Sequence, residues 1–269
     1  MLPTIATGNV ASATASTGFD VANSCRFNDG DSAYLSKTLG SNGNQKTFTW
    51  SAWIKRGTMG ASQFLFDVHA SGSHHSHIYI SSGNAVGVYN ANGNHSFSTN
   101  NLLRDPTAWY HLVWRVDTTQ GSNSDRVRIY INGTEASYAS YATIAQDTNF
   151  EVNGNGSACS IGRRSAGDYF DGYMAEIFFC DGQSYAPTVF GEYDSDSPTI
   201  WKPKDCKDDL TFGTHGYYFP FDDSADLGDD ESGQGNDFAE NNLAATDQAT
   251  DTPTNNFCTL NPLANYYNA

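Results

Sequence analysis

The apolar residues of this chain fall in many short segments, and turn-forming residues close each of them. Segments such as TFTWSAWIKR, SQFLFDVHA, HIYISS and AVGVYNA are bounded by Gly, Asn, Asp or Ser, a pattern that is typical of β-strands joined by tight turns. Aromatic residues, which favour strands, make up 13% of the sequence. This pattern leaves little material for helices and predicts an all-β chain.

One segment shows the strand pattern in full, because apolar and polar side chains alternate along RVRIYING. Val127, Ile129 and Ile131 share one face, and Arg126, Arg128 and Tyr130 share the other. This is the alternation of a half-buried strand, and the Asn132-Gly133 pair after it is a strong hairpin signal. Such strands build immunoglobulin-like sandwiches, propellers and jelly rolls. The lack of a repeat of roughly 40–50 residues argues against a propeller.

Length and local composition divide the chain into three parts. Its 269 residues are enough to bury one sizeable core. Residues 1–22 are small and polar and are predicted to form an extended arm, whereas residues 23–195 carry the strand pattern. Residues 196–269 form a polar extension with a Tyr/Phe cluster at HGYYFPFDD. Because this extension cannot bury much by itself, we expect it to pack on the sandwich or on a neighbouring subunit.

The charge of the chain narrows the range of partners. Asp and Glu total 30 against 14 Lys and Arg, which gives a formal net charge of −16. This charge repels phosphate backbones and anionic lipid headgroups, so nucleic acid and membranes are not expected as partners. The opening residues lack a charged segment followed by an apolar one, and every apolar run is shorter than the roughly 18 residues that span a bilayer. We therefore expect neither a secretory signal nor a membrane anchor.

The cysteines are scattered and include no C-x-x-C pair. This spacing indicates neither a zinc site nor a disulfide framework, so free buried thiols are predicted. One disulfide stays open as an alternative, since Cys159 and Cys180 would face each other if they lie on neighbouring strands. The full set is Cys25, Cys159, Cys180, Cys206 and Cys258.

A series of motifs spans about residues 25–195: RFNDGDSAYLSKT, FTWSAWIKRG, DPTAWYHLVWRVD, RVRIYINGTEA, IGRR and FDGYMAEIFFCDGQSYAPTVFGE. Their order resembles that of the concanavalin A-like, laminin G-like superfamily. The resemblance implies a two-sheet antiparallel jelly-roll sandwich of the lectin/glucanase type, with extended N- and C-terminal segments. It also implies a module that binds a ligand or is displayed on a surface.

The C-terminal extension carries a second resemblance. Its residues GYYFPFDDSADLGDDESGQGND and TPTNNFCTLNP are similar to a segment that follows a laminin G-like domain in structural proteins of marine bacteriophages. This implies a virion component, namely a tail fibre, head fibre or capsid-surface appendage, assembled in the bacterial host cytoplasm and exposed on the particle. The implied partners are further copies of the chain in a homotrimer, other virion proteins and a host-surface glycan. A free carbohydrate-binding lectin and a glycoside hydrolase of the same fold are the alternatives.

The hydrolase alternative requires two carboxylates that flank the scissile bond, usually from alternate positions of one inner strand. The comparable strand here reads AEIFFCD, in which Glu176 has Phe178 in place of an acidic partner. Asp181 is an odd number of residues away from Glu176, so its side chain would point to the opposite face of a regular strand. No G-x-S-x-G elbow accompanies the Ser, His and Asp residues. We therefore predict a non-enzymatic protein without catalytic residues.

The run HASGSHHSH holds the chain's densest group of histidines. If His75 and His77 lie on a strand, they point to the same face. Around a threefold axis such pairs could offer six imidazoles to a transition metal. The alternative is a solvated loop tip, because loops tolerate Gly, Ser and His freely.

Calcium is the other candidate ion, since the resemblance implies that domains of this kind often bind one. The segment DDESGQGND supplies carboxylate and amide oxygens, which are hard ligands of the right type. The candidate ligands are Asp229, Asp230, Asn236 and Asp237. Their spacing departs from the EF-hand pattern, and a solvated acidic turn is the alternative.

A sugar site needs an exposed aromatic ring for stacking and polar groups nearby for the hydroxyls. The segment GVYNANGNHSF offers such a set in Tyr89, Asn90, Asn92, Asn94 and His95. The tryptophans that fall in strand patterns are instead predicted to pack in the core. They are Trp50, Trp53, Trp109 and Trp114.

Overall fold

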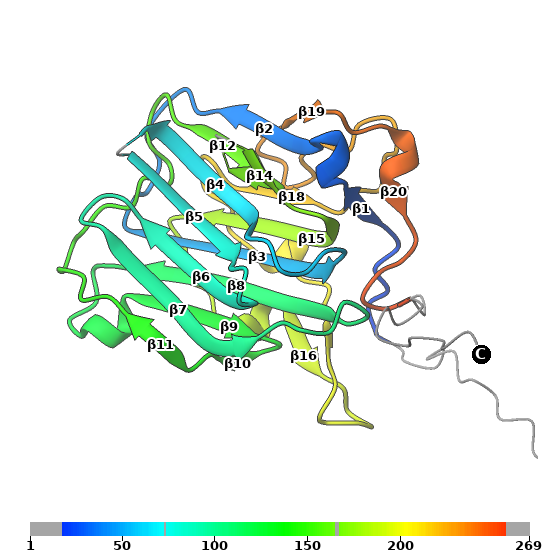
Figure 1. Cartoon of the computed structure of the whole chain (residues 1–269), viewed down its shortest axis with the longest axis horizontal. Coiled ribbons are helices and arrows are strands. Elements are labelled where there is room, and N and C mark those ends of the chain that lie inside the picture. Colours follow the sequence, from blue (N-terminus) through cyan, green and yellow to red (C-terminus); the bar gives the residue numbers. More distant parts are fainter. Residues whose placement is uncertain (1–17, 73, 165–166, 257–269) are drawn as a thin grey trace, which may run out of the picture.

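The computed structural model describes residues 18–72, 74–164 and 167–256. Within these residues the chain forms two large antiparallel sheets of eight strands each, which lie one over the other (Figure 1). Two sheets packed face to face are the architecture of a jelly-roll sandwich. The predicted all-β, two-sheet fold is confirmed.

The first sheet runs in the order β10–β9–β8–β3–β15–β1–β20. Strand β15 pairs with β3 along one edge, while β1 and β18 pair with successive parts of its other edge. The strands of this sheet are β1 (Ser24–Phe27), β3 (Thr47–Arg56), β8 (Trp109–Asp117), β9 (Val127–Ile131), β10 (Thr134–Glu135), β15 (Gly172–Asp181), β18 (Tyr217–Phe219) and β20 (Gln248–Ala249).

The second sheet runs in the order β11–β7–β6–β5–β4–β12–β2–β19. Its strands β4 to β7 follow one another in both sequence and space, so this half of the sheet is a simple meander. The strands are β2 (Tyr34–Thr38), β4 (Gln63–Ser71), β5 (His74–Ile80), β6 (Ala85–Asn90), β7 (His95–Leu102), β11 (Tyr138–Tyr141), β12 (Ala158–Ile161) and β19 (Ala239–Asn241).

Short elements complete the described part of the chain. Two further pairs of strands lie outside the large sheets: β13 (Arg163–Arg164) with β14 (Gly167–Tyr169), and β16 (Gly191–Tyr193) with β17 (Trp201–Pro203). The short 3-10 helices are η1 (Asp29–Asp31), η2 (Asn123–Asp125), η3 (Pro187–Val189), η4 (Lys207–Asp209) and η5 (Ala245–Asp247). No helix among the described residues is long and apolar enough to cross a bilayer.

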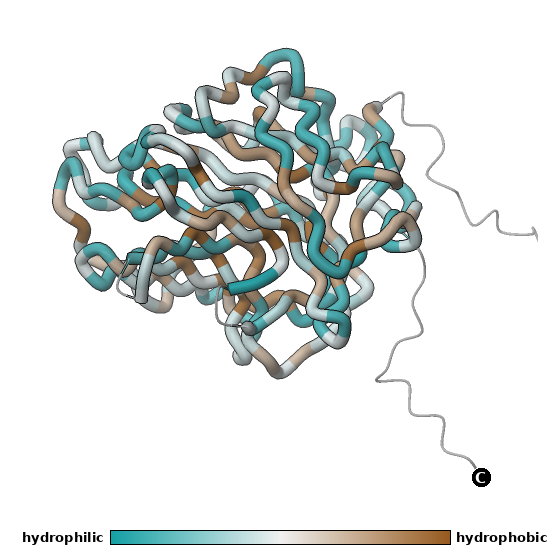
Figure 2. Tube along the Cα trace, turned by 90° about the horizontal axis from the view of Figure 1, so that it is seen from above, coloured by the Kyte–Doolittle hydropathy of each residue, from teal (hydrophilic) through white to brown (hydrophobic). Residues whose placement is uncertain are grey.

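The main core lies between the two sheets, where hydrophobic stretches gather in Figure 2. Strand β3 shows how the alternation of side chains builds it. Phe48, Trp50, Ala52 and Ile54 point into this core, whereas Trp53 belongs to a second cluster on the outer face. The four tryptophans predicted to pack in the core are all buried, at 8% exposure or less, so that prediction is confirmed.

The outer face of the first sheet is covered by chain segments from both termini. One cluster on this face combines Val113, Phe178 and Cys180 of the sheet with Cys206, Phe212 and Tyr218 of the C-terminal extension. Another joins Trp53, Trp109 and Ala175 to Val21 and Trp201. The extension also supplies strands to both sheets through β18, β19 and β20. Strand β3 is consequently buried on both faces.

The predicted hairpin at Asn132-Gly133 is confirmed. Both residues have positive φ, at 48° and 76°, and they connect β9 to β10. This is the backbone conformation that the turn between closely paired strands requires, and Asn and Gly tolerate it best. Val127 and Ile129 face the main core while Tyr130 packs on the outer face, as the alternation predicts.

The described cysteines, Cys25, Cys159, Cys180 and Cys206, are buried free thiols. The alternative disulfide does not form, because Cys159 lies on β12 of the second sheet and Cys180 on β15 of the first. The remaining predicted thiol, Cys258, lies outside the described residues.

Candidate functional site

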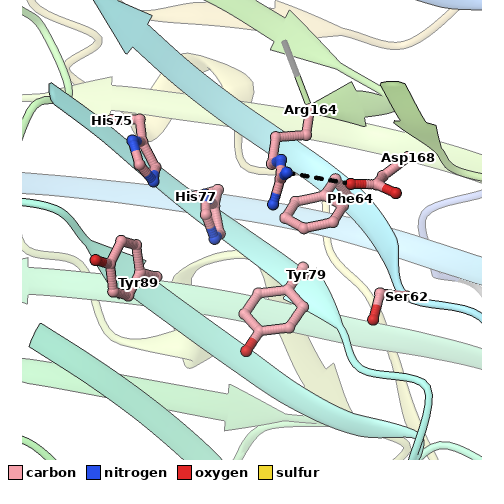
Figure 3. Close-up of a pocket in the computed structure, with 8 residues that line it drawn as sticks. All are labelled: Ser62, Phe64, His75, His77, Tyr79, Tyr89, Arg164 and Asp168. Atoms are coloured by element: carbon pink, nitrogen blue, oxygen red, sulfur yellow. Dashed lines mark ion pairs between the residues drawn. The ribbon is translucent and has the colours of Figure 1, made fainter. Parts of the chain in front are cut away.

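The two sheets differ in what lies on their outer faces. Apolar clusters cover the first sheet, whereas a hollow of about 500 Å³ opens on the outer face of β4, β5 and β6 in the second (Figure 3). Its lining residues are Ser62, Phe64, His75, His77, Tyr79, Tyr89, Arg164 and Asp168. We treat this hollow as the candidate site.

Strand pairing brings the rings of the site together. His75, His77 and Tyr79 occupy alternate positions of β5 and therefore share a face. Across the neighbouring strands, Phe64 on β4 stands opposite Tyr79, and Tyr89 on β6 stands opposite His77. The prediction that the two histidines point the same way is confirmed by their nearly parallel rings, 5.5 Å apart at an interplanar angle of 12°.

Tyr89 closes this group of rings. Its centroid lies 5.3 Å from that of His75 and 5.4 Å from that of His77, and Phe64 stacks on Tyr79 at 5.2 Å. These distances are those of favourable aromatic pairs. The hollow is therefore lined by a preorganised group of aromatic rings, the kind of side chain on which a sugar ring stacks.

A buried carboxyl group lies beside the His77 imidazole. Asp67 is fully buried on β4, and its Oδ1 is 3.3 Å from Nδ1 of His77, which is itself only 5% exposed. Burial lowers the pKa of His75, and the neighbouring His77 lowers it further. His75 is therefore neutral near pH 7 and gains its proton only in more acidic solution.

The rim of the hollow is built by the β13–β14 pair. The guanidinium carbon of Arg164 lies 5.1 Å from the centroid of the Phe64 ring, within range of a cation–π contact. Nη2 of Arg164 is 3.5 Å from Oδ2 of Asp168, and both side chains are substantially exposed, at 40% and 48%. The Arg164 guanidinium thus lies over the Phe64 ring and forms a long, partly exposed ion pair with Asp168.

The structure brings one of the five predicted sugar-binding residues into the hollow. Tyr89 lines it, and its hydroxyl donates to Oδ1 of Asn94 over 2.8 Å at the β6–β7 turn. Asn90 is fully buried and accepts a hydrogen bond from a serine hydroxyl on β5. Asn92 donates to a backbone carbonyl of a neighbouring loop, and His95 begins β7. These asparagines shape the turn beside the site.

Two of the predicted calcium ligands, Asp230 and Asp237, accept hydrogen bonds from backbone N–H groups. The Asp230 carboxylate accepts from the backbone N–H groups of Tyr218 and Asn236 at 2.9 and 2.8 Å, and Asp237 accepts from the N–H of Asp230. Burial, followed by the nearby Asp237, raises the pKa of Asp229. Calcium binding stays a prediction.

No group of three or more His, Cys, Asp or Glu in the described ranges is placed to hold a metal ion. His75 and His77 nevertheless lie side by side at the candidate site. A transition-metal site shared between subunits stays a prediction.

Glu176 and Asp181 stand in different surroundings on β15. A bulge between Ala175 and Phe178 leaves Glu176 with φ of +49° on the outer face, where the Tyr218 hydroxyl donates to its Oε2 over 2.9 Å. Burial raises the pKa of Glu176 to about 7. Asp181 instead accepts from the backbone N–H of Asn44 at 2.8 Å. Neither carboxyl group lines the hollow on the second sheet.

Sequence reasoning missed Ser62, Phe64, Tyr79, Arg164 and Asp168 as members of the site. A bulge between Phe64 and Phe66 breaks the alternation on β4, so the sequence does not show that Phe64 points outward. Arg164 reaches the hollow only through the placement of the β13–β14 pair. The alternation of side chains in the stretch HIYISS does place Tyr79 on the same face as His77, so the sequence held a signal for Tyr79.

A second hollow of about 610 Å³ lies among loops at one end of the sandwich. It is lined by Asn42, Gly43, Asn44, Gln45, Lys46, Asn149, Asp181, Gly182, Gly213 and Thr214. None of these residues is aromatic, so this hollow offers no ring for sugar stacking.

Residues 28–183 match the sequence profile of the Concanavalin A-like lectin/glucanases superfamily, in its laminin G-like form. The chain belongs to this superfamily. No curated protein matches the sequence at a significant level.

Among solved structures, the chain is similar to a Bacteroides ovatus protein described as a candidate carbohydrate-binding protein, with a TM-score of 0.57 and 16% identity over 83% of this chain. It spans 59% of that protein's length. The chain is also similar to a heptameric SAP-like pentraxin from Limulus polyphemus, with a TM-score of 0.46 and 15% identity. This match covers 62% of this chain and 80% of the pentraxin chain. A third similar structure is that of the LG4-5 domains of mouse laminin α1, with a TM-score of 0.45 and 14% identity. This match covers 69% of this chain and 46% of the laminin chain.

Proposed function

We propose that this chain is a non-enzymatic carbohydrate-binding protein, and that its glycan site is the hollow on the outer face of β4, β5 and β6. The observation that carries the proposal is the set of packed rings around Tyr89, which lies in a hollow on the outer face of the second sheet. The outer face of the first sheet, in contrast, is covered by apolar clusters. The fold alone does not define a ligand, because one fold hosts many functions. The chemistry of the hollow supplies the specific support.

The hollow provides both kinds of contact that a sugar requires. The apolar C–H face of a pyranose packs on a flat ring such as that of Tyr89, while hydroxyl groups need donors and acceptors at the rim. Ser62, Tyr79, Arg164 and Asp168 supply those groups within the same lining. The similarity to the Bacteroides ovatus protein supports this proposal at the level of the fold.

The surroundings of the acidic residues support the non-enzymatic part of the proposal. Glycoside hydrolysis uses two carboxyl groups roughly 5 to 9.5 Å apart across the scissile bond. Asp168 is the single carboxylic residue among those that line the hollow, and it is paired with Arg164. Glu176 is buried under Tyr218 on the other sheet.

Binding to a glycan array followed by calorimetric titration of the best hit tests this function. We expect saturable binding by the purified chain and a loss of about tenfold or more in affinity for Tyr89→Ala, because stacked aromatic rings contribute strongly to binding. Tyr193→Ala is the matched control, since Tyr193 is 47% exposed but lies on the separate β16–β17 pair. An array without hits, or equal losses for both variants, would contradict the proposal.

The second candidate places this site on a bacteriophage particle. The resemblance of residues 216–262 to phage structural proteins favours it, and it gives the glycan site a role in attachment to the host surface. In this proposal the chain is a tail fibre, head fibre or capsid-surface appendage that assembles in the host cytoplasm as a homotrimer with other virion proteins. A free lectin would use the same site without such partners.

A further inference from the structure

The lining of the hollow contains one group that can only donate hydrogen bonds and is always charged. The Arg164 guanidinium has five N–H donors and no acceptor. The hydroxyl groups of Ser62 and Tyr79 both donate and accept, and Asp168 is the single carboxylic residue of the lining. A ligand with a strong acceptor matches this set best, and the strongest acceptors on saccharides are ionised carboxylate and sulfate groups.

Arg164 is held in a way that leaves it able to bind such a group. Its pair with Asp168 spans 3.5 Å between partly exposed side chains, and exposed pairs of this kind contribute little free energy. The ring of Phe64 supports the guanidinium from below at 5.1 Å. A ligand anion can therefore share the guanidinium with Asp168 without disrupting the fold.

The imidazole rings of His75 and His77 line the same hollow as the Arg164 guanidinium. His69, His75 and His77 form a continuous stack, with centroid separations of 5.8 and 5.5 Å. The titratable and charged groups that face this stack are Asp67 from β4, Tyr79 from β5, Tyr89 from β6, and Arg164 and Asp168 from the β13–β14 pair. An imidazole carries at least one N–H donor, so the rings of His75 and His77 can add a hydrogen bond to an acceptor that Arg164 binds.

We propose that the ligand of this site is an anionic saccharide, whose carboxylate or sulfate group binds the Arg164 guanidinium beside the imidazoles of His75 and His77. This inference rests on the proposed glycan-binding function and names its ligand class. The chain as a whole carries a net charge of −16 and repels anions at long range. The attraction must therefore come from these local contacts.

The test compares neutral, carboxylated and sulfated glycans on one array, followed by titration of the strongest anionic hit and its neutral counterpart. We expect at least a tenfold preference for the anionic form, and its loss in Arg164→Gln. Arg163→Gln is the matched control, since it removes the same charge from the adjacent residue, whose guanidinium lies 3.5 Å from the Tyr34 ring centroid.

The possible outcomes distinguish a failure of the anionic-ligand inference from a failure of the proposed glycan-binding function. Preference for carboxylated or for sulfated glycans identifies the anionic group and supports the inference. Neutral glycans that bind as tightly as anionic ones, with no effect of Arg164→Gln, would overturn the inference while the glycan-binding function stands. An array without any hit would overturn both.

Discussion

Single residues decide how closely the rings of the candidate site approach each other. Gly87 on β6 stands opposite Tyr79 on β5, and a Cβ atom at position 87 would lie 2.5 Å from the Tyr79 ring. Such a contact is too short for any side chain. Gly87 therefore makes room for Tyr79 to lie across β6 and form one wall of the hollow.

The buried ion pair between Lys55 and Asp251 allows a prediction about the stability of the fold. Nζ of Lys55 lies 2.7 Å from Oδ2 of Asp251, with side-chain exposures of 2% and 8%, and Trp109 donates to Oδ1 of Asp251 over 3.0 Å. Asp251→Ala leaves the Lys55 ammonium buried without this carboxylate, which should lower the free energy of unfolding by about 3–5 kcal/mol. Chemical denaturation measures the change.

An exposed ion pair provides the control for this prediction. Lys46 and Asp147 are separated by 3.2 Å but are 41% and 57% exposed, so Lys46→Ala should cost no more than about 1 kcal/mol. The double variant Lys55→Met, Asp251→Leu should be less destabilised than Asp251→Ala alone, because it leaves no buried charge. Equal stability of Asp251→Ala and the wild type would refute the role given to this pair.

At the scale of strands, alternation predicted most faces correctly and failed where a bulge intervenes. The extra residue in β15 puts Ala175 and Glu176 on the same outer face, and a similar irregularity separates Phe64 from Phe66 on β4. A bulge depends on how a strand pairs with its neighbours, and it shifts the face of every residue beyond it. The sequence period alone cannot reveal this.

The C-terminal extension is predicted to be part of the folded unit. A shortened chain that ends at residue 195 would expose Val113, Phe178 and Cys180 on the first sheet and would lose β18, β19 and β20. With several large apolar side chains uncovered, we expect a loss on the order of 5 kcal/mol or more and aggregation. Thermal unfolding of both chains measures this, and equal melting temperatures would show that the extension is dispensable.

At the scale of the whole molecule, the two sheets have different surroundings. Segments from both ends of the described chain cover the outer face of the first sheet, whereas the second sheet carries the hollow. The proposed glycan site therefore lies on the outer face of the second sheet.

Oligomeric state tests the proposed virion appendage. We expect light scattering of the purified chain to give the mass of a trimer, as in a fibre built around a threefold axis. Dissociation of that trimer on addition of EDTA would support the predicted metal sites at His75 and His77 or at Asp229, Asp230, Asn236 and Asp237. A monomer that is indifferent to EDTA would contradict the trimer and favour the free lectin.

The sequence by itself determined the features that depend on local periodicity and turn chemistry. These are the all-β class, the Asn132-Gly133 hairpin, the burial of the tryptophans and the shared face of His75 and His77. Only the tertiary structure decided that Tyr89 joins these histidines and Arg164 in one hollow, while Asn90 turns into the interior. The physical reason is that strand pairing, bulges and the covering of a face are set by contacts between distant segments, which no local pattern of side chains encodes.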